Sequence, residues 1–399
     1  MTSLKDTPRG ERLHIGIFGR RNAGKSSLLN AVTEQDLAVV SPVKGTTTDP
    51  VFKAMELLPL GPVVLIDTPG IDDVGELGEL RIQKTKDILR RTDVALLVVD
   101  ADDGLTDADR TLIELFEKAT VPYLTVYNAT TPSAHSGSGS GSDEIWVNAQ
   151  SGENVPALKE KLAQIGKQET ATHRLVADLL SSGDVVILVT PIDSSAPKGR
   201  LILPQQQVTR DVLDIGGIPI LTQTDGLTGA LHKLRSPPKM VITDSQVFKQ
   251  VAAQTPQDVA LTSFSILMAR YKGILAQAVQ GARAIDTIQD GDAILISEGC
   301  THHRQCDDIG TVKLPRWIET HTGAKPTYTF TSGGEFPADI SPYRLIIHCG
   351  GCMLNTREMH YRQRIAQGAG VPMTNFGVAI SHMQGILERC VAGLACETE

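Results

Sequence analysis

Short apolar runs alternate with stretches of helical periodicity over the first 170 residues of the chain. The runs have the length and composition of strands that are buried on both faces of a sheet. They are Leu13–Phe18, Val63–Asp67, Val94–Asp100 and Val121–Tyr127. Lys25–Val32 and Asp107–Lys118 have the periodicity of helices lying between such strands. The pattern predicts an α/β domain in which helices cover both faces of a parallel sheet.

The same alternation continues in shorter units beyond residue 170. Strands are expected at Asp184–Thr190, Ile218–Gln223, Lys239–Thr243 and Val259–Thr262, and helices at Leu227–Leu234 and Ser245–Ala253. A long helical stretch, Ile266–Ala284, then opens a third region. Its expected strands are Ala293–Ile296, Thr327–Phe330 and Arg344–Ile347, and its expected helices are Met353–Gln367 and Met383–Val391. We therefore predict an α/β protein with domains over residues 1–170, 171–265 and 266–399.

Composition and charge narrow the class of protein. A chain of 399 residues is too long for a single ordinary core. Its net charge of -8 argues against a surface built for nucleic-acid phosphates, so we expect no nucleic-acid partner. No apolar run reaches membrane-spanning length, and the polar N-terminus lacks a secretory signal. All six cysteines lie beyond residue 299, which favours a metal site over a disulfide framework, in a cytoplasmic protein.

The segment Gly19–Ser26 fits the phosphate-binding pattern G-x-x-x-x-G-K-S and lies between a predicted strand and a predicted helix. Its glycines let backbone N–H groups turn toward phosphate oxygens, and the helix N-terminus adds positive potential. In this motif the lysine, Lys25, reaches the terminal phosphates and the serine, Ser26, binds Mg²⁺. The residues expected around the nucleotide phosphates are Gly19, Asn22, Ala23, Gly24, Lys25, Ser26 and Ser27.

Two further segments belong to the same predicted catalytic site. Asp67-Thr68-Pro69-Gly70 ends a buried strand, where an aspartate holds Mg²⁺ through water and Gly70 can sense the γ-phosphate. Gly45–Asp49 resembles the first switch of Era/MnmE-like GTPases, in which the second threonine, here Thr47, reaches Mg²⁺. We therefore expect Lys25, Thr47, Asp67 and Gly70 to carry catalysis.

The hydrolysis rate and its ion dependence can also be predicted. Ile71 occupies the position where Ras-like GTPases carry a water-orienting glutamine, so intrinsic turnover should be slow. Asn22 matches the P-loop asparagine through which related GTPases hold a potassium ion. Such an ion could supply the positive charge of an arginine finger. The alternative is that Asn22 only satisfies the loop backbone.

The base pocket departs from the usual pattern. Asn128-Ala129-Thr130-Thr131 keeps only the asparagine of the guanine motif Asn-Lys-x-Asp, and loss of the aspartate should weaken discrimination. A Ser/Gly run, Ser136–Ser142, follows where a helix is expected and has the composition of a flexible linker. Asn148–Gly152, which includes Ala149, still resembles the last guanine-loop motif. The prediction of nucleotide binding therefore rests on the P-loop, whereas the prediction of guanine specificity rests on the resemblance of these motifs to those of GTPases.

Cysteine and histidine residues follow two predicted strands of the third region. Cys300-Thr301-His302 follows one, and His348-Cys349-Gly350-Gly351-Cys352 follows another. Ligands collect at such carboxyl ends in open α/β sheets. Cys300, Cys349 and Cys352 could hold an iron–sulfur cluster, with His302, His348, water or an exchangeable group on the fourth iron. The same donors also suit a structural zinc ion.

The combination of C-x-H, a long gap and H-C-x-x-C downstream of an Era-like GTPase resembles the FeFe-hydrogenase maturation GTPases, the HydF family. Further matching segments are Pro191–Asp193, Ala196–Gln205, Asp307–Gly310, Pro315–Trp317 and Val378–Ile380. The resemblance implies a GTPase domain, a dimerisation domain and a domain that binds a 4Fe–4S cluster through Cys300, Cys349 and Cys352. It implies GTP or GDP with Mg²⁺ as cofactors, and a homodimer formed through the middle domain. It also implies a scaffold that receives a diiron precursor made with radical-SAM maturases and delivers it to apo FeFe-hydrogenase.

Two other classes of protein fit the sequence less well. An Era-type GTPase with a structural zinc site, acting in RNA or ribosome assembly, is disfavoured by the acidic balance. A radical enzyme is disfavoured because the sequence lacks the C-x-x-x-C-x-x-C signature.

Overall fold

The computed structural model describes residues 7–34, 51–68, 76–129, 143–170, 174–192, 201–300 and 308–394. The chain divides into two compact units, Met1–Thr172 and His173–Glu399. Each unit is described by itself. Among the described residues, no helix combines the length and the apolar character needed to cross a bilayer.

The first unit is built on a six-stranded sheet of order β2-β3-β1-β4-β5-β6. The strands are β1 (Leu13–Phe18), β2 (Val51–Leu57), β3 (Gly61–Asp67), β4 (Val94–Asp100), β5 (Tyr123–Asn128) and β6 (Glu144–Val147). β2 runs antiparallel to β3, and the other pairs are parallel. The sequence therefore predicted the four central strands, β1, β3, β4 and β5, and missed the two at the edges, β2 and β6.

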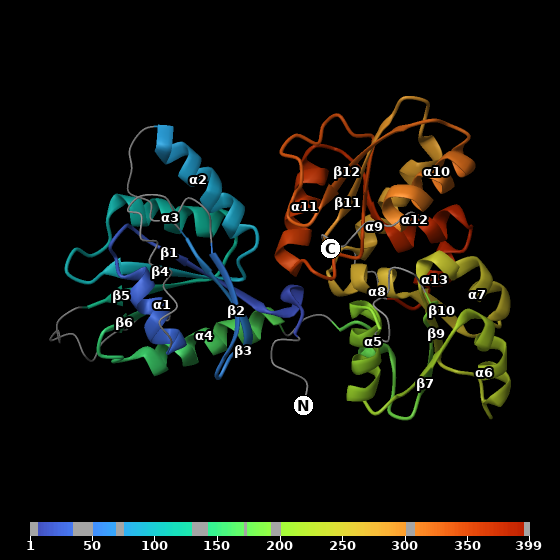
Figure 1. Cartoon of the computed structure of the whole chain (residues 1–399), viewed down its shortest axis with the longest axis horizontal. Helices are drawn as coiled ribbons and strands as arrows, with labels where there is room; N and C mark the ends of the chain where they lie inside the picture. The colour runs from blue at the N-terminus through green and yellow to red at the C-terminus, as the bar shows by residue number, and fades with distance from the viewer. Residues whose placement is uncertain are drawn as a thin grey trace. The chain divides into compact units, whose positions relative to one another are not determined.

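Helices cover both faces of this sheet, as predicted (Figure 1). α1 (Lys25–Thr33) and α4 (Val155–Thr170) pack on one face, where they share an apolar core with β1 and β4. α2 (Glu76–Leu89) and α3 (Asp107–Lys118) pack on the other, around Phe18 and Phe116. The short turn η2 (Arg9–Glu11) precedes β1. The P-loop thus connects the middle of the sheet to a helix whose apolar side is fixed by packing.

The second unit begins with a four-stranded parallel sheet of order β10-β9-β7-β8. Its strands are β7 (Val185–Val189), β8 (Ile218–Thr222), β9 (Met240–Thr243) and β10 (Ala260–Ser263). Its helices are α5 (Leu203–Asp214), α6 (Leu227–Lys233) and α7 (Phe248–Gln254), with short turns η3 (Ala177–Leu179), η4 (Thr224–Gly226) and η5 (Ser245–Val247). All four strands lie within a residue or two of the predicted ranges.

A second parallel sheet of the same unit has the order β12-β11-β13-β14. Its strands are β11 (Ala293–Glu298), β12 (Thr327–Ser332), β13 (Leu345–His348) and β14 (Met373–Asn375). α11 (Thr356–Gly368) lies on one side of the sheet, and α10 (Leu314–Thr322) and α12 (Phe376–Met383) lie on the other (Figure 1). Three short elements of this part of the chain are η6 (Arg283–Thr287), η7 (Ile309–Lys313) and α13 (Leu387–Val391). One continuous apolar core includes residues of both sheets.

Two predicted helices are wrong in their extent, and a glycine explains each case. The stretch expected to run from Ile266 to Ala284 is two helices, α8 (Phe264–Tyr271) and α9 (Leu275–Ala282), separated by Gly273 at φ +68°. Met383–Val391 is likewise interrupted by Gly385 at φ +69°, between α12 and α13. A residue in the left-handed backbone conformation ends a helix, because it turns the chain out of the helical path.

Candidate functional site

The P-loop joins β1 to α1 and depends on residues that adopt positive φ. Gly19 has φ +140°, Asn22 has φ +66° and Gly24 has φ +91°. A Cβ on Gly19 would lie 2.3 Å from the carbonyl oxygen of Val98 in the neighbouring strand. The loop can therefore approach β4 only with glycine at this position.

Lys25 and Asp67 lie at the mouth of this loop. Nζ of Lys25 donates hydrogen bonds to the carbonyl oxygens of Gly19, at 2.9 Å, and Arg20, at 2.5 Å. Burial raises the pKa of Asp67, and the charges of Lys25 and Lys53 oppose the rise. A carboxylate and an ammonium group therefore share the site expected for Mg²⁺ and the terminal phosphates.

The other predicted residues of this site divide into two groups. Asn22, Ser26 and Ser27 are exposed to solvent at the P-loop and the first turn of α1, where phosphate and Mg²⁺ would bind. Thr47 and Gly70 lie outside the described residues.

The P-loop is also fastened by ion pairs that the sequence did not predict. Nη2 of Arg20 lies 3.0 Å from Oδ2 of Asp103, and Nε lies 3.5 Å from Oδ2 of the buried Asp109. Asp109 in turn accepts hydrogen bonds from the backbone and hydroxyl of Thr106, which caps α3. The P-loop is therefore tied to the start of the neighbouring helix.

Asn128 connects the P-loop to the base-binding side of the domain. It ends β5, and its amide Nδ2 donates to the carbonyl of Ala23, at 3.5 Å. Its Oδ1 accepts the backbone N–H of Ala149, at 3.1 Å. A Cβ on Gly24 would lie 2.0 Å from Nδ2 of Asn128, so the fit leaves no room there. The guanine-motif asparagine thus has a structural role, whereas Thr130, Thr131 and the Ser/Gly run lie outside the described residues.

The second candidate site lies where β11 and β13 end. These strands pair in parallel, with Ser297 opposite His348. Cys300 comes two residues after β11, and the loop Cys349–Cys352 directly follows β13. The two cysteine-bearing segments therefore leave neighbouring strands at the same edge of the sheet.

Backbone contacts bring these two segments side by side. The N–H of Gly299 donates to Sγ of Cys349, at 3.0 Å, and the N–H of Gly351 approaches the same sulfur at 3.4 Å. A Cβ on Gly299 would lie only 3.4 Å from Cα of Gly351. The residue before Cys300 thus touches the loop that carries Cys349 and Cys352. Backbone N–H groups directed at cysteine sulfur are a feature that tunes iron–sulfur clusters.

The local chemistry of the two loop thiols is set by burial and by a buried cation. Burial raises the pKa of Cys349. Burial, with the neighbouring Cys349, raises the pKa of Cys352 to about 12, and the charge of Lys272 opposes this rise. Lys272 is 1% exposed, and its Nζ donates to the carbonyl of Leu354, at 2.8 Å. At neutral pH the thiols are therefore protonated, and a bound metal has to displace these protons.

His348 does not fit the predicted role of a fourth ligand, because both of its ring nitrogens have partners within the protein. Nδ1 donates to the carbonyl of Cys349, at 2.8 Å, and Nε2 accepts from Nη1 of Arg362, at 2.9 Å. Burial and then the charge of Arg362 lower the pKa of His348 to about 3, so the ring is neutral. The alternative ligand, His302, lies outside the described residues.

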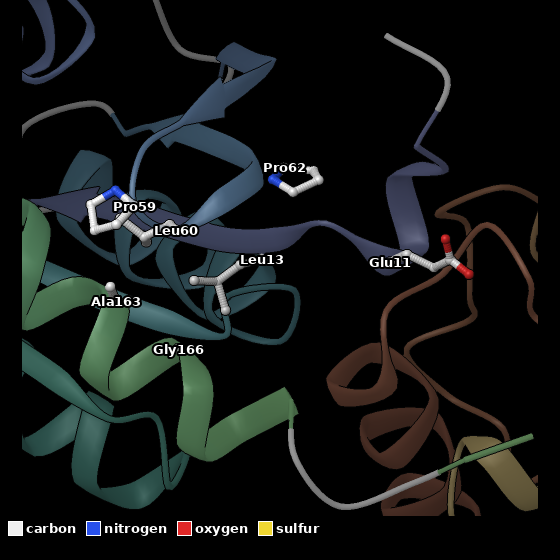
Figure 2. Close-up of a pocket in the computed structure, with 7 residues that line it drawn as sticks. All are labelled: Glu11, Leu13, Pro59, Leu60, Pro62, Ala163 and Gly166. Carbon is white, nitrogen blue, oxygen red and sulfur yellow. The ribbon is translucent and has the colours of Figure 1, made fainter. Parts of the chain in front are cut away.

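A pocket elsewhere in the first unit is unrelated to these sites. It has a volume of about 190 Å³ and lies at the start of β1. Leu13 projects between Leu60 and helix α4, which carries Ala163 and Gly166 (Figure 2). The P-loop follows the opposite end of the same strand. This pocket is therefore not the nucleotide site.

Comparison with protein families identifies the chain. The hydrogen maturase F dimerization domain matches residues 175–273, and the hydrogen maturase F tetramerization domain matches residues 276–393. The chain belongs to the hydrogen maturase F family. A third model, described as a 50S ribosome-binding GTPase, matches residues 14–129 of this hydrogen maturase F chain. The chain is therefore a GTP-binding maturase of the hydrogen maturase F type, with a P-loop GTPase domain followed by α/β folds that are associated with oligomerization.

Curated relatives match the GTPase part of this hydrogen maturase F sequence. The tRNA modification GTPase MnmE of Thiobacillus denitrificans is 35% identical over 40% of this chain and 35% of its own length. MnmE of Lactococcus lactis subsp. lactis is 36% identical over 39% of this chain and 34% of its own length. The chain thus spans about a third of the length of these relatives.

Solved structures similar to this chain include Era of Aquifex aeolicus bound to GDP·AlF₄⁻, at 15% identity and a TM-score of 0.34, over 80% of this chain and 93% of that one. A probable GTP-binding protein engB has 20% identity and a TM-score of 0.31, over 39% of this chain and 99% of that one.

Proposed function

We propose that this protein is a GTP-hydrolysing scaffold that binds a 4Fe–4S cluster through Cys300, Cys349 and Cys352. In this role it receives a diiron precursor in the cytoplasm, from radical-SAM maturases, and carries it to apo FeFe-hydrogenase. The observation that carries the proposal is the contact between the N–H of Gly299 and Sγ of Cys349, which brings the two cysteine segments together. Membership of the hydrogen maturase F family supports it independently.

The surroundings of the cysteines suit an anionic cluster. Three thiolates would bring negative charge to a partly buried loop, and such charge requires nearby compensation. Lys272 supplies a buried cation that acts on Cys352, and Arg362 supplies one that acts on Cys349. Because His348 is occupied by its own hydrogen bonds, the fourth iron would be left to His302, water or the diiron cargo. An exchangeable position is what delivery of a metal fragment needs.

The GTPase domain would tune association with partners rather than perform metal chemistry. Lys25 and Asp67 lie together at the P-loop mouth, as phosphoryl transfer requires. The positive φ of Asn22 and its exposure agree with a loop residue that can contact potassium. We propose slow intrinsic hydrolysis that is faster in potassium than in sodium. Equal rates in the two salts would remove the role given to Asn22.

The first sheet of the second unit has an edge suited to self-association. β8 is the last strand of its sheet, and Ile218 and Leu221 on it are 50% and 42% exposed. Leu213, near the end of the adjacent α5, is 53% exposed. An open strand edge with apolar side chains pairs readily with a second copy. We propose that the homodimer forms along β8.

Anaerobic reconstitution with iron and sulfide tests the scaffold proposal. The wild-type chain should turn brown and give a paramagnetic 4Fe–4S signal on reduction. Cys349→Ser should lose this signal, whereas Cys390→Ser is the matched control, because Cys390 is a buried cysteine of α13 and belongs to neither cysteine segment. Lys25→Ala should lose GTP hydrolysis and keep the cluster. A colourless protein with stoichiometric zinc would instead support the Era-type GTPase with a structural zinc site.

A further inference from the structure

Three side chains from separate elements meet on the surface of the second unit, outside the sites described above. They are Asp286 in η6, His321 in α10 and His382 in α12. Nε2 of His321 lies 2.8 Å from Oδ1 of Asp286, and Nε2 of His382 lies 3.0 Å from Oδ2. The two imidazole rings have centroids 6.1 Å apart. Each carboxylate oxygen of Asp286 therefore lies within hydrogen-bond distance of one imidazole nitrogen.

The spacing of the donor atoms is close to that of a metal site. The three candidate ligand atoms all lie within 4.8 Å of one another. In a tetrahedral zinc site with Zn–N bonds of 2.0–2.1 Å, ligand atoms are about 3.3 Å apart. The distance from His321 to Oδ1 of Asp286 and the distance from His382 to Oδ2 are each within about half an ångström of this value. Small side-chain rotations would therefore let one cation replace the two bridging protons.

Two nitrogens and one carboxylate form a donor set that divalent first-row cations prefer. Zinc accepts imidazole and carboxylate together, and a site with three protein ligands leaves one position for water. The side chains of Asp286, His321 and His382 are 51%, 29% and 19% exposed, so an ion can reach them from solvent. The hydrogen bonds from the two histidines already hold the pKa of Asp286 below its ordinary value, so the carboxylate is charged at neutral pH.

The cluster lies at the other end of the sheet from the cysteine loop. Asp286 precedes β11, whereas Cys300 follows it. The six residues of β11 span about 20 Å at the usual rise per residue of a strand. Metal bound at one site therefore leaves the other free.

We propose that Asp286, His321 and His382 form a second metal site, which takes a divalent cation of the zinc type with a water molecule as fourth ligand. The ion would cross-link three elements, because Asp286 is separated in sequence by 35 residues from His321 and by 96 from His382. Such a link would stabilise the packing of η6, α10 and α12, since a metal that binds only the folded chain adds its binding free energy to folding.

Anaerobic titration of the metal-free full chain with Co²⁺ distinguishes this site from the cysteines. Cobalt on thiolates gives intense charge-transfer absorption, and cobalt on nitrogen and oxygen gives only weak visible bands. Wild type should show both kinds of absorption. His321→Ala should lose the weak bands and weaken cobalt binding at this site roughly 100-fold, whereas Cys349→Ser should lose only the charge-transfer band.

Two further variants sharpen the result. Asp286→Asn keeps the size and an acceptor oxygen but removes the charge, so it should bind at least about tenfold more weakly. His232→Ala removes an exposed helical histidine elsewhere in the unit and should bind as wild type does. Zinc should displace the cobalt and raise the melting temperature of wild type by more than that of His321→Ala, which keeps only the cysteine site. Absence of the weak bands in wild type, or their persistence in His321→Ala, would overturn the proposal and leave a hydrogen-bonded bridge.

Discussion

Arg362 contacts residues at the ends of both strands that precede the cysteine segments, and its replacement gives a sharp test. The guanidinium is completely buried in α11. Its Nε donates a hydrogen bond to Oε1 of Glu358, at 3.0 Å, and its Nη2 donates to the carbonyl of Gly333, at 3.0 Å. Its Nη1 donates to Oγ of Ser297, at 3.2 Å, and to Nε2 of His348, at 2.9 Å. One cation therefore joins the ends of β11 and β13 to the loop after β12.

The magnitude follows from the partner that is left behind. Arg362→Met keeps the volume but leaves the carboxylate of Glu358, which is 1% exposed, without its counter-charge. Removing one member of a buried ion pair costs about 3–5 kcal/mol. For a unit of the size of His173–Glu399 this lowers the melting temperature by about 6–20 °C. The double variant Glu358→Leu/Arg362→Met should recover at least half of the loss, because both charges are then absent.

Thermal unfolding of the metal-free full chain, followed by circular dichroism, measures this effect. Arg364→Met is the matched control, because Arg364 is exposed on the same helix. Iron content after reconstitution should fall as well, since Gly333 also donates its N–H to the carbonyl of Cys300. A melting temperature for Arg362→Met within about 2 °C of the control would refute the reasoning. So would a double variant that is less stable than either single one.

Three further predictions concern other parts of the molecule. Gly24→Ala should abolish binding of a fluorescent GTP analogue, because its Cβ would overlap Nδ2 of Asn128, and it should leave the unfolding of the second unit unchanged. Hydrogen bonding from Arg270 holds the pKa of Asp178 below its ordinary value. Asp178→Asn should therefore be less stable than wild type at neutral pH, and urea unfolding should show the two converging as the pH falls below the ordinary aspartate pKa. Leu221→Glu should place a charge on the β8 edge and convert the dimer to monomers in sedimentation velocity, whereas an unchanged sedimentation coefficient would place the interface elsewhere.

The sequence predicted the central strands because continuous apolar runs mark strands that are buried on both faces. β2 was missed because it is an edge strand whose residues are mostly half-buried, so Lys53 and Glu56 interrupt the apolar pattern. β14 was missed because Met373–Asn375 is too short to stand out from a loop. The breaks at Gly273 and Gly385 were missed because a single glycine inside a helical pattern does not reveal its φ.

The candidate sites were predictable where the chemistry is contiguous in sequence. The P-loop and the Cys349–Cys352 loop each carry their signature within a few residues. The residues that surround them carry no such signature. Lys272 reaches the cysteine loop from the break between α8 and α9. Arg362, in α11, donates a hydrogen bond to Nε2 of His348, one of the two histidines expected as candidates for the fourth ligand.

Strand order explains why both sites lie where they do. In the first unit β1 lies between β3 and β4. The chain passes from β1 toward the β3 side and then returns from β3 to β4 on the other side, so its direction reverses beside β1, which the P-loop follows. In the sheet β12-β11-β13-β14, the chain passes from β11 to β12 on one side and returns to β13 on the other. The crevice opened by such a reversal is where open α/β sheets bind ligands. Cys300 and Cys349 follow the two strands that flank this reversal. The fold therefore supplies the position of each candidate site, and the residues of the loops decide which ligand each site suits: a nucleotide at the P-loop and, in our proposal, a metal cluster at the cysteines.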